Sequence, residues 1–223
     1  MAQAGIHALV GTAVRKWIPK TQWLMLGILL GSIFPDMDNI AVAIATVLKK
    51  PTEGLHRTFT HSIFTILLFV LVFWLIGQIT KQPRWTNFGL GFGIGILMHI
   101  LLDLVIWFNG VAILWPIPSW INLWEGKPPD WFDKFMNPAE MLCIVAFFVV
   151  LDRMARQYGT DSDFLRTLKI WTIVEAVLFI IFTPLAYTMQ KGFLTLFGVG
   201  YLFSLFLAFG VIIRMRKTVE AGS

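Results

Sequence analysis

The chain has 223 residues, of which 57% are apolar and 14% are charged, and its formal net charge is +5. Soluble globular domains carry roughly 25% charged residues, so this chain has too little charge to cover a surface that faces water. We therefore expect an all-α, polytopic transmembrane helical bundle that forms a single integral membrane domain over residues 1–223. No basic stripe or RNA-binding motif is present, and we expect no nucleic acid among the partners.

The N-terminal part of the chain predicts a short helix and then a broken span. Residues 3–14 are apolar but too few to cross a bilayer, so we expect a re-entrant or interfacial helix there. The first span covers about residues 22–47 and is interrupted at Pro35, which removes a backbone donor and disfavours helix at the residue before it. Such a break is tolerated only where protein or a water-filled cavity covers it.

The remaining apolar runs predict five further helices, which gives about five to six spans. They lie at residues 62–80, 87–108, 138–151, 170–189 and 194–213. The run 87–108 has glycine at alternate positions, which permits close helix packing: Gly89, Gly91, Gly93 and Gly95. Residues 109–137 are rich in tryptophan and proline, and we expect this loop to lie at the level of the lipid headgroups.

The distribution of basic residues predicts the orientation. With six crossings, twelve of the 18 Lys and Arg residues fall on one side of the membrane. Loops on the cytoplasmic side carry the excess of Lys and Arg. We therefore expect both termini in the cytoplasm, and residues 56–62 and the tryptophan-rich loop on the outer side.

The polar residues inside the apolar spans predict a functional site, because ionisable groups at membrane depth are costly. Residues 56–62 (HRTFTHS) contain His56 and His61 and stand at the mouth of a span. His99 and Asp103 share one helix face a turn apart. Asp36 and His99 both lie roughly 20 Å from the inner end of their spans, at 1.5 Å per residue. These side chains should therefore share one layer.

Imidazole and carboxylate donors favour Zn²⁺, with Mn²⁺ or Fe²⁺ as alternatives. There are more candidate donors than one tetrahedral ion requires, which suggests two divalent ions. Two-metal sites commonly act on phosphate esters, so we expect a substrate of that class. Asp36 and Asp38 point in different directions, so one can be a ligand and the other an orienting partner. Arg57 can hold a phosphate oxygen. A transporter and a non-catalytic, metal-stabilised membrane scaffold remain alternatives.

The same residues resemble the motifs of the YdjM family of bacterial inner-membrane proteins, which are described as candidate metal-dependent hydrolases. The matching segments contain His7, Pro35-Asp36-Met37-Asp38, residues 56–62, the His99–Asp103 pair followed by Trp115-Pro116, and Asn137 with Glu140. The resemblance implies a metal site formed by His7, Asp36, Asp38, His56, His61, His99 and Asp103, with Glu140 as a further candidate. It also implies a distant relation to zinc-dependent phospholipase C and nucleases. Departures from the motifs at Asn39, Thr58 and residues 105–107 concern the substrate pocket.

We therefore expect a membrane-embedded metal-dependent hydrolase in the bacterial inner membrane. Its substrate should be a lipid phosphate ester or phosphodiester near the outer leaflet. Residues 1–145 should form the core that bears the site, and residues 146–223 should add transmembrane helices. In the expected reaction a metal-activated water attacks, Asp38 or Glu140 orients it or takes a proton, and Arg57 offsets phosphate charge.

Overall fold

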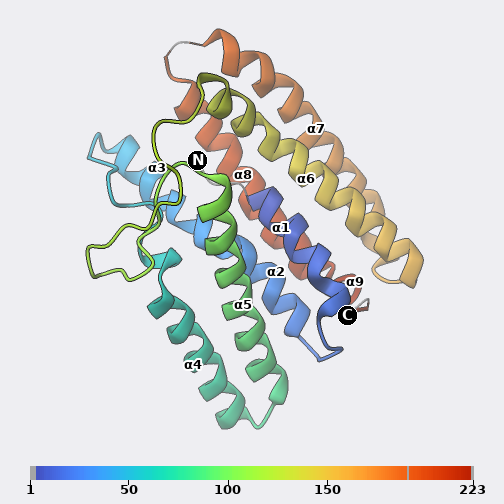
Figure 1. The fold of residues 1–223 in the computed structure, drawn as a ribbon. Helices are drawn as coiled ribbons and strands as arrows, with labels where there is room; N and C mark the ends of the chain where they lie inside the picture. Colours follow the sequence, from blue (N-terminus) through green and yellow to red (C-terminus); the bar gives the residue numbers. More distant parts are fainter. Residues whose placement is uncertain (1–3, 190, 222–223) are drawn as a thin grey trace.

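The protein is described by a computed structural model, which covers residues 4–189 and 191–221. Within these residues it is a helical bundle without β-strands (Figure 1). Six helical segments are long and apolar enough to cross a membrane: Leu24–Val47, Ile63–Thr80, Pro83–Ile106, Asp130–Tyr158, Ser162–Thr188 and Phe193–Arg214. The predicted all-α transmembrane architecture is confirmed, with six candidate spans. The side of the membrane that each terminus faces stays a prediction.

The helices follow one another in the order in which Figure 1 labels them. They are α1 (Ala4–Ala13), α2 (Leu24–Ile33), α3 (Asn39–Val47), α4 (Ile63–Thr80), α5 (Pro83–Ile106), α6 (Asp130–Tyr158), α7 (Leu165–Thr188), α8 (Phe193–Arg214) and α9 (Arg216–Ala221). Short 3₁₀ turns occupy Val14–Trp17, Phe34–Asp38, Phe59–His61 and Ser162–Phe164.

Helix α1 has only 10 residues, too few to span a bilayer, and it packs inside the bundle. It lies beside α2 and α6 (Figure 1). Its residues Ala4, His7 and Ala8 are buried, and a Cβ atom on Gly5 would lie 2.8 Å from the Cβ atom of Cys143 on α6. The tight fit of this small-residue helix brings His7 into the interior.

Close contact between α2 and α5 forms the centre of the bundle, and glycines on both helices permit it. A Cβ atom on Gly27 or Gly31 would lie 2.3 or 2.2 Å from a carbonyl oxygen of α5. A Cβ atom on Gly91 or Gly95 would lie 2.1 or 2.3 Å from a carbonyl oxygen of α2. Small residues let helix backbones meet in this way, so the prediction drawn from the alternate glycines is confirmed.

Helix α6 is much longer than predicted. The sequence prediction started this span at Pro138, but the helix already begins at Asp130 and continues to Tyr158, and Pro138 lies inside it. Asp130 and Asp133 occupy its first turn, where the positive end of the helix dipole stabilises their negative charges. The helix ends at Gly159, which has a φ of 64°. The proposed division between residues 145 and 146 falls within this helix.

Candidate metal centre

The predicted break in the first span is present as the 3₁₀ turn Phe34–Asp38, between α2 and α3. Asp36 lies in this turn and is fully buried. Neither carboxylate oxygen of Asp36 has a hydrogen-bond partner among the described residues. A buried carboxylate without a partner is strongly unfavourable, so this position calls for a cation or a proton.

Helix α5 supplies His99 and Asp103, which are one turn apart and fully buried. The Nδ1 atom of His99 lies 2.7 Å from the carbonyl oxygen of Ser32 on α2. A carbonyl can only accept a hydrogen bond, so Nδ1 carries the proton and Nε2 keeps its lone pair. Metal-binding histidines are commonly oriented by such an outer contact. The close packing of α2 on α5 therefore orients the imidazole of His99, so that its Nε2 atom faces the other candidate ligands.

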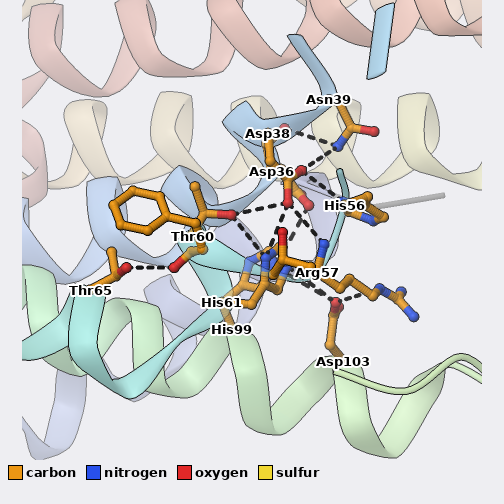
Figure 2. A network of polar contacts seen from close by, with 12 residues as sticks. Asp36, Asp38, Asn39, His56, Arg57, Thr60, His61, Thr65, His99 and Asp103 are labelled. Atoms are coloured by element: carbon orange, nitrogen blue, oxygen red, sulfur yellow. Dashed lines mark hydrogen bonds and ion pairs between the residues drawn. The ribbon is translucent and has the colours of Figure 1, made fainter. Parts of the chain in front are cut away.

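His61 completes a set of four donor atoms with His99, Asp36 and Asp103 (Figure 2). Its Nε2 atom lies 3.2 Å from Nε2 of His99 and 3.6 Å from Oδ2 of Asp103. The Nε2 atom of His99 lies 3.6 Å from Oδ1 of Asp36 and 3.8 Å from Oδ2 of Asp103. A tetrahedral zinc ion with ligands at about 2.0–2.2 Å holds its donors roughly 3.3–3.6 Å apart. These four separations are close to the donor–donor distances of a zinc site, and Asp36 also lies within 4.8 Å of both histidines.

His7 adds a second position beside this set. Its Nε2 atom lies 3.2 Å from Oδ1 of Asp103, and its ring stacks on that of His99 with centroids 3.6 Å apart. The two oxygens of Asp103 therefore face different groups, with Oδ1 toward His7 and Oδ2 toward His61 and His99. A carboxylate in this position can bridge two ions. The donors His7, His99 and Asp103 form one of three groups in which donor atoms lie within 4.8 Å of one another.

Asp38 has an orienting position. Its carboxylate accepts hydrogen bonds from the backbone N–H of Arg57 at 2.9 Å and from the hydroxyl of Thr60 at 3.0 Å. It also lies 2.7 Å from Nδ1 of His56 and 3.3 Å from Nδ1 of His61. His61 therefore points one ring nitrogen at Asp38 and the other into the four-donor set. Asp38, His56 and His61 form another candidate group for a metal ion, but hydrogen bonds already engage the Asp38 oxygens.

Arg57 is buried and directed at Asp103, with its Nε atom 3.1 Å from Oδ2. Its Nη1 atom donates to the carbonyl oxygen of Asn109 at 3.1 Å, and the guanidinium lies 5.4 Å from the ring centroid of Trp107. The backbone of Arg57 has a φ of 62°, a conformation that is uncommon for a residue other than glycine. The structure therefore places this guanidinium against a candidate metal ligand, whereas the sequence suggested a contact with substrate phosphate.

The cluster attracts positive charge. Asp36 and Asp103 are fully buried, the side chain of Asp38 is 7% exposed, and the permanent cation Arg57 pairs with Asp103. Burial disfavours the imidazolium form of His61, but its contacts with Asp103 and Asp38 prevail and raise its pKa to about 9. An arrangement that stabilises a proton in this place would equally stabilise a divalent cation.

Glu140 is buried but belongs to none of the three donor groups. Both of its carboxylate oxygens accept from the backbone N–H of Gly5, at 2.9 and 3.1 Å. This contact satisfies a donor in the first turn of α1, two residues before His7. Glu140 therefore positions α1, and its suggested part in proton transfer stays a prediction.

Sequence reasoning missed Tyr201 on α8. This tyrosine is almost fully buried and its hydroxyl faces Asp36, within electrostatic reach of the carboxylate. Neither group completes a hydrogen bond with any residue that the structure describes. A lone tyrosine in an apolar span gives little signal in a sequence. Glu175, which is buried on α7, accepts a hydrogen bond from Ser204 on α8 at 2.9 Å.

Tyr201→Phe removes the hydroxyl that faces the candidate ligand Asp36, and we expect metal binding to weaken about 10-fold, the lower end of the effect of a residue beside a ligand, because no complete hydrogen bond is lost. The phenyl ring keeps the packing, so the thermal stability of the metal-free protein should stay unchanged. Competition with a fluorescent zinc chelator would measure the affinity. The matched control is Tyr187→Phe, because Tyr187 is exposed on α7. Equal affinities for the two variants would exclude a role for Tyr201.

The tryptophan-rich loop is fastened to the segment that carries His56 and His61. The N–H of Ala112 donates to the carbonyl oxygen of Arg57 at 2.9 Å, and the N–H of Ile63 donates to that of Ile113 at 2.9 Å. The hydroxyl of Ser62 donates to the carbonyl oxygen of Trp115 at 2.9 Å. Large apolar side chains of this loop are exposed, including Trp115, Trp120 and Trp124. An exposed surface of aromatic side chains thus lies beside the candidate metal centre.

A family model described as YdjM inner membrane protein matches residues 2–159. The matched region contains all four histidines and the three aspartates of the cluster, while Tyr201 lies beyond it. Comparisons with curated proteins and with solved structures gave no match.

Proposed function

This chain belongs to the YdjM inner membrane protein family, and we propose that it is a metal-dependent hydrolase whose site lies within the membrane bundle. The observation that carries the proposal is the convergence of four buried donors from three separate segments: Asp36, His61, His99 and Asp103. Hydrogen bonding does not account for Asp36, because neither of its carboxylate oxygens has a hydrogen-bond partner within the described chain. Asp103 has ion-pair contacts with Arg57 and His7 at 3.1 and 3.2 Å, so Asp36 carries this part of the argument.

These four residues would hold the first ion, and Zn²⁺ suits a set of two imidazoles and two carboxylates. His7 and the second oxygen of Asp103 would hold another ion. That second position has few protein donors, so an ion there would keep coordination positions open for water or a substrate oxygen. A pair of divalent ions polarises phosphoryl oxygens and lowers the pKa of water, which is the chemistry of many phosphoesterases.

The remaining residues support this arrangement. Asp38 holds the ring of His61 through Nδ1, and Arg57 holds Asp103 and offsets negative charge near the site. The side chain of His56 is 22% exposed, which makes it the most accessible histidine in the described ion pairs. Its Nε2 atom is itself buried and has no hydrogen-bond partner among the residues described. Because this nitrogen is unused and the ring is partly accessible, we assign His56 to proton exchange with the substrate.

The proposed substrate is a lipid phosphate ester or phosphodiester. The tryptophan-rich loop supports this choice, because it is hydrogen-bonded to residues 57, 62 and 63 and exposes Trp115, Trp120 and Trp124. Tryptophan side chains prefer the headgroup region of a bilayer. A lipid whose phosphate reaches His56 would leave its acyl chains in the bilayer.

Purified protein incubated with bacterial lipid extract tests the proposal. We expect release of phosphate or of a phosphorylated headgroup, a loss of about a hundredfold or more on chelation, and recovery when Zn²⁺ is added. His99→Ala should lose the activity and should not regain it with Zn²⁺. Activity that neither chelation nor His99→Ala changes would refute the proposal.

A further inference from the structure

A groove of about 510 Å³ lies between the end of α1 and the second half of α6, away from the metal-binding residues. Its apolar walls come from Leu9, Val10 and Ala13 on one side and from Val150 and Met154 on the other. From Leu9 to the basic residue Lys16 the helix rise is roughly 10 Å. The groove can therefore accommodate a length of hydrocarbon chain parallel to α1.

The end of the groove is basic, because Arg15 and Lys16 line it. The guanidinium of Arg15 is held in place by Tyr158, whose hydroxyl accepts from Nη2 at 3.0 Å and whose ring centroid lies 5.3 Å from Cζ. The Nη1 atom of Arg15 is buried, and no residue in the described chain accepts a hydrogen bond from it. A fixed guanidinium with an unused donor is prepared for an oxygen that comes from outside the protein.

The position of this basic end matches the level of lipid headgroups. Trp17 follows directly and is 78% exposed, as expected of an aromatic anchor at the membrane surface. The apolar walls start two residues after His7, whose Nε2 atom lies 3.2 Å from Asp103 in the candidate span α5. An occupant therefore needs a negative charge at the surface and hydrocarbon below it.

We propose that this groove is a binding site for one anionic phospholipid, with its phosphate at Arg15 and Lys16 and an acyl chain between α1 and α6. Basic pockets between membrane helices bind anionic headgroups in this way. A zwitterionic lipid would carry a compensating positive charge to the same basic end. A free phosphate ion would contact only the basic end and would leave the apolar part of the groove unfilled.

The test uses the full chain in detergent, with phosphatidylglycerol and phosphatidylcholine of identical acyl chains and retained lipid counted by native mass spectrometry. The wild type should retain phosphatidylglycerol more strongly. The double variant Arg15→Gln/Lys16→Gln should bind it roughly 25-fold more weakly, from about fivefold per basic residue near an anionic lipid. Lys16→Gln alone should show the fivefold effect, and its exposed side chain leaves folding unaffected.

The matched control is Lys20→Gln/Lys81→Gln, which removes the same charge from two exposed positions outside the groove. This control should retain phosphatidylglycerol as the wild type does. Equal retention of phosphatidylcholine, equal loss in the control, or full competition by inorganic phosphate would each overturn the proposal. None of these results depends on hydrolase activity or on bound metal.

Discussion

Asp103→Asn should deprive the protein of most of its metal and of its hydrolytic activity. Asp103 lies 3.2 Å from His7, 3.6 Å from His61 and 3.8 Å from His99, so it contacts all three of these histidines. The amide of asparagine keeps the shape but removes the charge and turns an N–H₂ group toward histidine or Arg57. We expect metal affinity and turnover to fall by about a hundredfold or more.

Metal content by mass spectrometry and turnover of lipid extract would measure both effects. Asp133→Asn is the control, because it makes the same change on an exposed residue of α6. An Asp103→Asn protein that folds and keeps the metal content of the wild type would contradict the assignment of Asp103 as a ligand.

Gly31→Ala should strongly destabilise the protein. The new Cβ atom would lie 2.2 Å from the carbonyl oxygen of Phe92 on α5, and its surroundings there are backbone atoms that cannot move aside. Helices α2 and α5 would have to separate, which we expect to lower the free energy of unfolding by about 3 kcal/mol or more. Separation would also break the contact between Ser32 and His99 that orients the imidazole.

Thermal unfolding of the purified protein in detergent would show this loss. Gly198→Ala and Gly210→Ala serve as controls, because a Cβ atom at either position on α8 meets no atom within 4 Å. Both controls should be neutral or slightly stabilising, since alanine is the better helix former. A Gly31→Ala protein as stable as these controls would show that α2 and α5 are not tightly packed.

The sequence predicted the parts of the fold that depend on hydropathy and on proline and glycine. The apolar runs located the spans, Pro35 located the break, and the alternate glycines predicted close helix packing. The sequence did not identify α2 as the helix that Gly91 and Gly95 contact. The start of α6 was missed because Pro138 was taken as the first residue of a helix. In the folded protein Pro138 lies inside α6. The pattern of apolar residues does not show whether a proline begins a helix or lies within it.

The residues of the candidate site could be predicted from the sequence, but which of them are ligands and which orient the ligands could not. Histidines and aspartates at membrane depth pointed to one cluster, since hydrocarbon would otherwise exclude them. The sequence could not distinguish Asp36 from Asp38, because the difference lies in the hydrogen bonds that Arg57 and Thr60 make to Asp38. The direction of Arg57 depends on a positive φ and on the carbonyl of Asn109, neither of which follows from local residue patterns.

The most direct measurement is the zinc, manganese and iron content of wild-type protein purified from membranes without added metal. The account predicts at least one equivalent of a divalent ion per chain, with Zn²⁺ favoured, and its loss in the Asp103→Asn variant. Wild-type protein that is folded, contains no such ion and takes up none when Zn²⁺, Mn²⁺ or Fe²⁺ is supplied would contradict it.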